Sequence, residues 1–249
     1  MKTISRREAL KLSGIGILGA AAMPLSANVG NTGIAAGKKV VVVGAHPDDP
    51  ETGCGGTMIL YAAAGYEVVS AYLTRGEAGI RGKSYDEAAA IRTQEAMNAC
   101  KIMNARPAFI GQIDGNCEIT PQRYTEMYDF LKKESPDIVI THWPIDRHRD
   151  HRICSVLVYD AWIKLSRSFE LYYFEVESGE QTQNFAPTDF VDISAVAEKK
   201  HAACFAHVSQ NIEKVYAEYH THMEKFRGMQ ANCKFAEGFV KHHQSLMSI

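Results

Sequence analysis

The stretch KKVVVVGAHPDDPE, residues 38–51, decides the fold of this 249-residue chain. Residues 40–43 are four consecutive valines, and such an unbroken β-branched run predicts a strand that is buried on both faces. Polar residues that suit a loop follow from His46 onward. A strand covered on both faces indicates a parallel sheet between layers of helices, so the polar loop is expected at the carboxyl edge of that sheet.

Strand-like and helix-like segments alternate along the rest of the chain. The other strands are predicted at residues 67–74, 107–110, 137–142 and 171–176. The helices are predicted at residues 55–65, 86–104, from 120 onward, and at 151–165. This alternation predicts a Rossmann-like, doubly wound α/β fold with a mostly parallel sheet and helices on both faces. A strand at 190–193 and the helical segments after it are expected to form a C-terminal α+β extension of a single domain, residues 37–249.

The composition is that of an ordinary globular protein. Hydrophobic residues make up 46% of the chain and charged residues 22%, with a formal net charge of −2. A nucleic-acid partner would usually require a basic face, so none is expected. No two of the six cysteines have CxxC spacing, so we expect buried thiols and no structural zinc knuckle.

The first 36 residues resemble an export signal. The sequence SRREALK at residues 5–11 is similar to a twin-arginine signal, and an apolar stretch rich in Gly and Ala follows at residues 12–23. That stretch is shorter than the roughly 20 residues that a spanning helix needs. We therefore predict an exported, periplasmic or extracellular protein whose mature chain has no stable membrane span.

Two short polar segments are candidates for chemistry. AHPDDPE at residues 45–51 follows the first strand, and DRHRDH at residues 146–151 follows the strand that ends near residue 142. A catalytic zinc needs three N/O ligands and an open position for water. His46 and Asp49 supply a closely spaced pair, and His151 is the natural third ligand. One Zn²⁺ per chain is predicted, although similar sites accept Fe(II), Co or Mn.

The neighbours of these ligands suit acid–base roles. Asp48 is placed to take a proton from water as a general base. His148 is expected to stabilise the developing oxyanion or to protonate the leaving amine. Asp150 is expected to orient His148 and to stabilise its charge.

Each segment also has a structural interpretation. Asp-Asp-Pro-Glu suits the N-terminus of a helix, because carboxylates interact favourably with the helix dipole and Pro is tolerated in the first turn. Residues 150–151 could likewise begin the next helix. The presence of both segments, each at the end of a predicted strand and with complementary ligand types, favours a metal site.

At these residues the sequence resembles the PIG-L/LmbE-like N-acetylglucosaminyl deacetylases. The matching motifs are HPDDPE at residues 46–51 and DxHxDH at 146–151, with weaker matches at residues 74–79 and 92–95. The resemblance implies zinc on His46, Asp49 and His151, with Asp48 as the base. It further implies that His148 stabilises the tetrahedral intermediate with the support of Asp150.

Other polar residues near these motifs are weaker candidates. Arg75 and Glu77, on a Gly-rich loop, and Trp143, beside the second motif, are candidates for contact with a sugar. Arg75 and Glu77 could instead be charges on a solvated loop, and Trp143 could instead pack in the core. Glu51 is left out of the catalytic set, as a charge at a helix N-terminus.

The expected activity is that of a metal-dependent amide hydrolase. The leading hypothesis is removal of an N-acetyl group from an N-acetylglucosamine-type sugar or glycoconjugate. An amidase of a non-sugar conjugate and a non-catalytic sugar-binding relative are the alternatives. The sequence assigns no oligomeric state.

Overall fold

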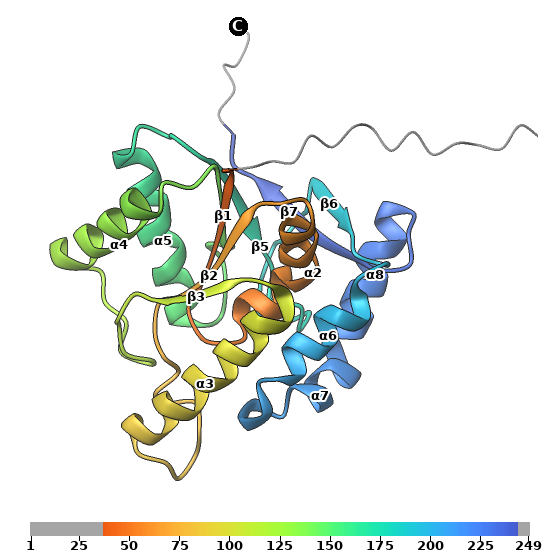
Figure 1. Cartoon of the computed structure of the whole chain (residues 1–249), viewed down its shortest axis with the longest axis horizontal. Coiled ribbons are helices and arrows are strands. Elements are labelled where there is room, and N and C mark those ends of the chain that lie inside the picture. The colour runs from red at the N-terminus through yellow and green to blue at the C-terminus, as the bar shows by residue number, and fades with distance from the viewer. Residues whose placement is uncertain (1–36, 244–249) are drawn as a thin grey trace, which may run out of the picture. The chain divides into compact units, whose positions relative to one another are not determined.

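The computed structural model describes residues 37–243, and these residues form a seven-stranded sheet flanked by helices (Figure 1). The export signal predicted at residues 1–36 lies outside the described residues. Within residues 37–243, no helix is both long enough and apolar enough to cross a membrane.

The sheet has the strand order β3-β2-β1-β4-β5-β7-β6. Five strands run parallel: β1 (Lys39–Gly44), β2 (Glu67–Tyr72), β3 (Arg106–Phe109), β4 (Ile138–His142) and β5 (Glu170–Phe174). Two pair antiparallel at one edge: β6 (Asp189–Asp192) and β7 (Ala236–Lys241). The predicted mostly parallel α/β sheet is confirmed, and the C-terminal extension adds its strands to the same sheet.

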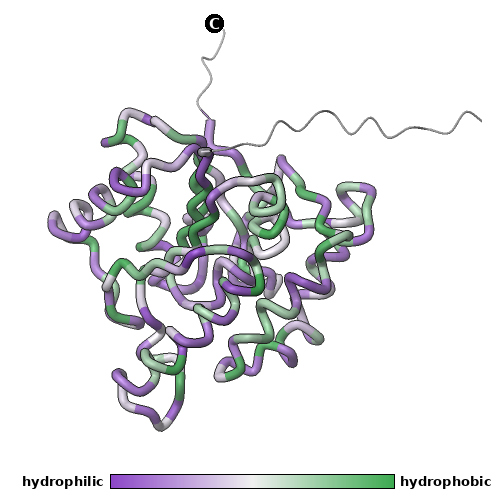
Figure 2. Tube along the Cα trace, viewed as in Figure 1, coloured by the Kyte–Doolittle hydropathy of each residue, from purple (hydrophilic) through white to green (hydrophobic). Residues whose placement is uncertain are grey.

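The valines of β1 divide the apolar interior into two halves. Val41 and Val43 pack on the face covered by α4 (Pro121–Glu134) and α5 (Arg149–Lys164). Val40 and Val42 pack on the opposite face. That second face is covered by α2 (Asp49–Ala63), α3 (Tyr85–Met103) and α6 (Ala197–Phe205). All four valines are fully buried, and Figure 2 shows this strand as a hydrophobic segment in the middle of the fold.

Helix α2 begins at Asp49, six residues before the predicted start at residue 55. Its glycines obscured the helix, because Gly has a low intrinsic helix propensity. A Cβ atom on Gly53 would lie 2.4 Å from the Phe174 ring, and one on Gly56 would lie 2.5 Å from Ile193 Cγ2. These glycines therefore let α2 approach its neighbours closely, and the helix starts inside the first polar motif.

The C-terminal helices enclose a buried cation. They comprise α6, the short helix η1 (Val208–Gln210), α7 (Ile212–Val215), the π-helix η2 (Tyr216–His220) and α8 (Thr221–Ala231). Lys200 Nζ lies 3.1 Å from Glu177, 2.9 Å from Glu224 and 2.9 Å from Glu237. Glu237 also accepts the N–H groups of residues 56 and 57 in α2, each at 2.8 Å. This cluster ties the extension to the helix that carries the first motif.

The six cysteines are free thiols, and five of them are buried. Burial raises the pKa of the Cys54 and Cys204 thiols well above the ordinary range, which keeps them protonated. The prediction of buried thiols is confirmed.

Replacement of Lys200 by Met should destabilise the protein strongly, because it leaves buried carboxylates without their cation. The expected loss is about 3–5 kcal/mol in the free energy of unfolding, measured by urea titration. Lys199→Met, at the exposed neighbouring position, is the control. Equal stability of the two variants would show that the buried ion cluster contributes nothing.

Candidate metal centre and active site

The two polar motifs meet at the carboxyl edge of the sheet. Strands β1 and β4 are direct neighbours, with Val43 paired to Thr141. The chain turns from β1 into α2 through residues 45–48, and from β4 into α5 through residues 143–148. Between β1 and β4 the strand order changes direction, and ligands of doubly wound sheets bind at such a switch point. The predicted meeting of the two motifs is confirmed.

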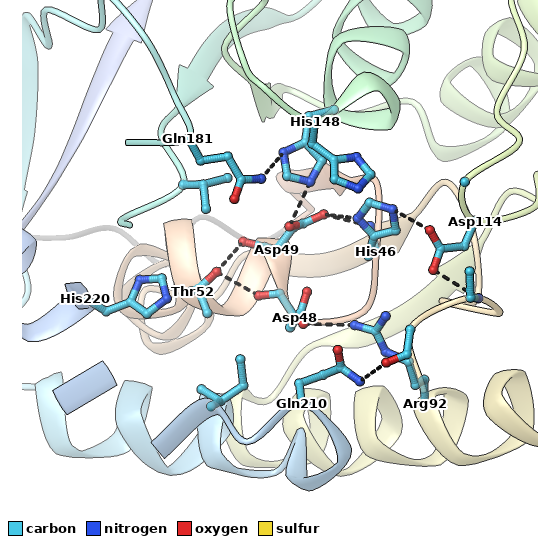
Figure 3. A pocket seen from close by; sticks show the side chains of 16 residues that line it. His46, Asp48, Asp49, Thr52, Arg92, Asp114, His148, Gln181, Gln210 and His220 are labelled. Carbon is cyan, nitrogen blue, oxygen red and sulfur yellow. Dashed lines mark hydrogen bonds and ion pairs between the residues drawn. The ribbon is translucent and has the colours of Figure 1, made fainter. Parts of the chain in front are cut away.

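A pocket of about 520 Å³ opens at this edge (Figure 3). Five of the six predicted metal-binding and catalytic residues line it: His46, Asp48, Asp49, His148 and His151. Asp150 is not among the lining residues, because its side chain is fully buried behind them. The rest of the lining comes from several elements: Thr52, Ala78, Gly79, Arg92, Asp114, Gly115, Val176, Gln181, Gln210, Ile212 and His220.

The carboxylate of Asp49 lies between the rings of His46 and His151. Its Oδ2 is 3.2 Å from His46 Nδ1, and its Oδ1 is 3.3 Å from His151 Nε2. All three side chains are more than 90% buried. Two imidazole nitrogens and a carboxylate are a donor set that suits a catalytic divalent cation.

Carboxylates hold the outer nitrogens of the two rings. His46 Nε2 lies 3.1 Å from Asp114 and 3.4 Å from Asp150, and His151 Nδ1 lies 3.2 Å from Asp146. Metal-binding histidines usually donate their second N–H to such a partner, which fixes the tautomer and the ring orientation. The arrangement leaves His46 Nδ1 and His151 Nε2 to face Asp49 and a shared cation.

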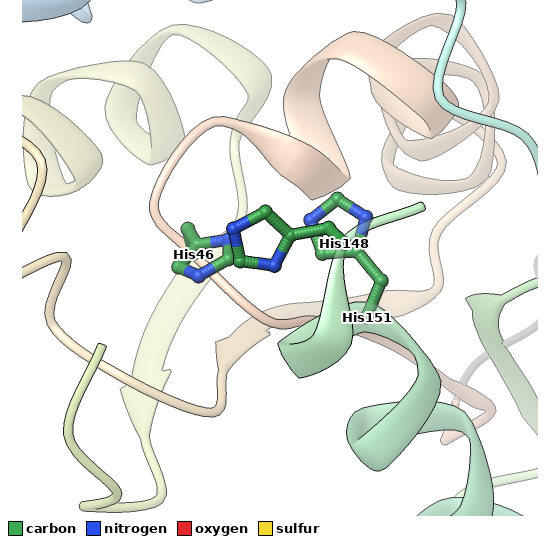
Figure 4. A group of neighbouring side chains, drawn as sticks. All are labelled: His46, His148 and His151. Atoms are coloured by element: carbon green, nitrogen blue, oxygen red, sulfur yellow. The ribbon is translucent and has the colours of Figure 1, made fainter. Parts of the chain in front are cut away.

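Three overlapping groups within residues 37–243 bring donor atoms close enough to hold a metal ion. They are His46–His148–His151 (Figure 4), Asp49–His142–His151 and His46–Asp114–Asp150. In the second group, His142 Nε2 already accepts the N–H of Ala45 at 3.0 Å. Burial, followed by the nearby His151, lowers the pKa of His142 to about 4, so this imidazole is neutral. Its ring stacks on that of His151, with 3.9 Å between the ring centroids.

The electrostatics of the site favour a positive charge. Burial opposes protonation of His46, but the carboxylates of Asp114, Asp150 and Asp49 outweigh it and raise the pKa well above the ordinary value. Burial likewise opposes protonation of His151, whose pKa is nevertheless raised to about 9 by Asp49 and Asp146. A cavity that stabilises imidazolium also stabilises a bound cation, so the residues present fit a divalent metal.

Asp48 has a strained backbone that points its carboxylate into the pocket. Its φ angle is +118°, a region that residues other than Gly rarely adopt and that costs about 1–3 kcal/mol. Arg92 donates to Asp48 Oδ2 at 2.9 Å and also contacts the Pro47 carbonyl oxygen. Thr52 donates to the Asp48 carbonyl oxygen at 3.0 Å. Burial raises the pKa of Asp48 despite the opposing charge of Arg92, which makes this carboxylate a better base than an ordinary Asp.

Glu51 lies in the first turn of α2, as predicted, and it also supports the strained Asp48. It is fully buried, and its Oε2 accepts the Asp48 N–H at 3.1 Å. Its Oε1 accepts the Tyr72 hydroxyl at 2.6 Å and the Ser70 hydroxyl at 3.0 Å. The spacing Asp48-x-x-Glu51 is that of a capping box, which is the sequence signal that points to this contact.

His148 and Asp150 are adjacent, but their contacts differ from the predicted ones. His148 Nδ1 accepts the backbone N–H of Asp150 at 3.2 Å, so its proton sits on Nε2. The Asp150 carboxylate instead lies near His46 Nε2 and accepts the Gly115 N–H at 2.7 Å. Burial, together with His46 and His151, lowers the pKa of His148. His148 is therefore a neutral donor, and the Asp150 carboxylate acts on His46.

The three residues predicted to contact a sugar lie outside the pocket lining. Arg75 is exposed and its Nε donates to Thr93 at 3.1 Å. Glu77 is buried and accepts the Asp114 N–H at 3.1 Å, so it orients the loop that carries Asp114. Trp143 is half-buried and packs edge-on against the core residue Tyr173, with 5.7 Å between ring centroids. Arg92 and Asp114 occupy the pocket instead, and they come from segments distant in sequence from both motifs.

The chain is similar in sequence to known proteins. The sequence model of a family described as PIG-L, GlcNAc-PI de-N-acetylase, matches residues 41–162. Diacetylchitobiose deacetylase of Thermococcus kodakarensis is 30% identical over 220 residues, which are 81% of this chain and 82% of that protein. The 4-oxalmesaconate hydratase of Pseudomonas putida is 28% identical over 213 residues, 78% of this chain and 81% of that protein.

A solved structure shows the same fold. The crystal structure of the 4-carboxy-2-hydroxymuconate hydratase from Pseudomonas putida KT2440 has a TM-score of 0.75 at 25% identity. The similarity covers 85% of this chain and 99% of that one. It therefore extends beyond the segment matched by the family model.

Replacement of Asp114 by Ala should weaken metal binding, because His46 loses a carboxylate partner on its outer nitrogen. We expect about a 10- to 100-fold lower affinity for Zn²⁺, measured by competition with a chromogenic chelator. Asp129→Ala, an exposed position on α4, is the control and should bind the metal like the unmodified protein. An unchanged affinity of Asp114→Ala for Zn²⁺ would contradict the view that Asp114 orients His46 through its Nε2 atom.

Proposed function

Because this chain belongs to the PIG-L family of de-N-acetylases, hydrolases of carbon–nitrogen bonds other than peptide bonds, we propose that it removes the acetyl group from an N-acetylated amino sugar. The products are acetate and the free amine. The observation that carries the proposal is the placement of Asp48 beside the Asp49–His46–His151 donor set in one pocket.

His46, Asp49 and His151 are proposed to hold one divalent metal, Zn²⁺ by the chemistry of its ligands. A divalent cation held there would lower the pKa of water and polarise the carbonyl group of the amide. The outer nitrogens of the two histidine rings are held by carboxylates, that of His46 by Asp114 and Asp150 and that of His151 by Asp146.

Asp48 is proposed to act as the general base. Its carboxylate takes a proton from the attacking water and then delivers it to the leaving nitrogen, so that the amine departs neutral. The raised pKa of Asp48 suits both steps. Arg92 and Glu51 hold this residue in place from two sides, and the strained backbone is kept by these contacts.

His148 is proposed to stabilise the oxyanion that forms when water adds to the amide carbonyl. The bond from the Asp150 N–H to Nδ1 leaves Nε2–H as the free donor of the ring. A neutral donor suffices for this role because it stabilises charge that develops during the reaction.

The amino-sugar substrate is supported by two observations. The relative from Thermococcus kodakarensis, which is 30% identical to this chain, is a diacetylchitobiose deacetylase. The pocket is lined by several uncharged polar side chains besides the catalytic group, including Thr52, Gln181 and Gln210. The leader predicted at residues 1–36 further supports a periplasmic or extracellular enzyme that acts on glycan-derived molecules.

The similarity to a hydratase favours a second candidate function, the addition of water to an unsaturated organic acid. The same base would serve that reaction, because Asp48 would again take a proton from the attacking water. The two functions differ in their products, since a hydratase releases neither acetate nor amine.

Acetate release from a panel of N-acetylated sugars should separate these functions. We expect release from at least one glucosamine-bearing substrate, loss of activity after chelation, and recovery when zinc is restored. The panel includes N-acetylglucosamine and diacetylchitobiose, and consumption of an unsaturated dicarboxylic acid is measured in parallel. Consumption of the unsaturated acid without acetate release from any sugar would replace the proposal by the hydratase function.

Asp48→Asn should abolish turnover and leave the metal bound, because it removes the base without touching a proposed ligand. We expect at least a 100-fold lower kcat at an unchanged zinc content, measured by acetate release and by metal analysis. Asp129→Asn is the matched control on the surface. Persistence of turnover in Asp48→Asn would show that another group acts as the base.

A further inference from the structure

The pocket has a second polar end that the proposed chemistry does not use. In Figure 3, His220 and Thr52 lie on one side of Asp49, and Arg92 and Asp114 lie on the other. His220 comes from the C-terminal extension, far in sequence from both motifs. It belongs to none of the three groups that could hold a metal ion.

His220 is buried without a partner for its inner nitrogen. Its exposed fraction is 3%, and within residues 37–243 its Nδ1 atom has no hydrogen-bond partner. A buried polar atom without a partner is destabilising, and such an atom in a native structure calls for an explanation. The Nδ1 atom is itself enclosed by the protein, whereas the ring lines the pocket, so Nε2 is the nitrogen that is open to a bound molecule.

The surroundings of His220 keep its ring neutral. Burial, followed by the buried ammonium of Lys200, lowers its pKa to about 4 against the opposing effect of Glu224. A neutral imidazole carries one N–H donor and one acceptor nitrogen. Such a ring suits an uncharged polar partner such as a hydroxyl group, and it does not suit a carboxylate or phosphate that needs a cation.

The backbone and the neighbours of His220 fix the ring in place. It is the last residue of the π-helix η2, and π-turns within helices occur frequently at functional sites. Its ring packs against that of Tyr216 at 4.9 Å between centroids. The Tyr216 hydroxyl in turn donates to Glu224 at 3.1 Å. The ring is thus held in place by packing against a buried network.

We propose that His220, through Nε2, binds a hydroxyl group of the sugar part of the substrate, at the end of the pocket opposite Arg92. The inference rests on the proposed function for the sugar class of the ligand. Val176 and Ile212 line the same pocket and offer apolar contacts for the carbon atoms of a sugar ring. Selection of hydroxylated amides over plain amides follows, because an amide without hydroxyl groups leaves the nitrogen unpaired.

The test measures binding of two probes to zinc-loaded protein on the Asp48→Asn background, which is designed to prevent turnover. The probes are N-acetylglucosamine and N-cyclohexylacetamide, which has a six-membered ring but no hydroxyl groups. His220→Phe should weaken N-acetylglucosamine binding about tenfold by calorimetry and change N-cyclohexylacetamide binding less than about twofold, as expected for one lost hydrogen bond. His220→Gln, whose amide can replace Nε2, should retain most of the affinity for the sugar.

Two controls separate recognition from a structural role. His222→Phe changes an exposed histidine of α8 and should leave both affinities unchanged. The melting temperature of His220→Phe should equal or exceed that of its parent, because an apolar ring replaces an unpaired nitrogen.

The inference is overturned if His220→Phe weakens both probes equally, or leaves N-acetylglucosamine binding unchanged. It is also overturned if the parent protein binds N-cyclohexylacetamide as tightly as the sugar. Because binding is measured without turnover, these outcomes are independent of acetate release, on which the proposed function stands or fails.

Discussion

The carboxylate of Asp49, held between His46 and His151, is the contact on which the rest of the site depends. It joins the loop after β1 to the first turn of α5, two segments about a hundred residues apart. Asp49 is the first residue of α2, so its position depends on how closely that helix approaches the sheet. Gly53 and Gly56 permit that approach, because neither leaves space for a side chain. The close packing of α2 thereby fixes the position of the Asp49 carboxylate.

Two groups at this edge of the sheet destabilise the folded state, and contacts elsewhere in the fold compensate for them. Asp48 adopts a positive φ angle, and His220 carries an unpaired nitrogen, both of which are unfavourable in the folded state. The surrounding structure holds them: Glu51 and Arg92 fix Asp48, and the Lys200 cluster ties the C-terminal helices to α2. Strained or unpaired groups that persist in this way are typical of binding and catalytic sites.

The sequence predicted the elements whose signals are local. Four consecutive valines gave the central strand, and the two polar motifs gave the residues that meet at the carboxyl edge. Helix α2 was predicted too short, since the glycines that permit its packing also weaken its helical pattern. Asp114 and His220 reach the pocket from distant segments, so no spacing pattern connects them with the motifs. Arg92 was indicated only by the weaker family match at residues 92–95. Trp143 sits beside a motif in sequence but faces the core, because neighbouring residues of an extended chain point in opposite directions.

The most direct test of the metal assignment is the position of the metal in a zinc-loaded crystal, from anomalous diffraction at the zinc edge. We expect one zinc ion per chain, bound by His46 Nδ1, Asp49 and His151 Nε2, with Asp114 and Asp146 on the outer nitrogens of the two rings. A zinc ion bound by His46 Nε2, Asp114 and Asp150, with Asp49 unbound, would contradict this assignment.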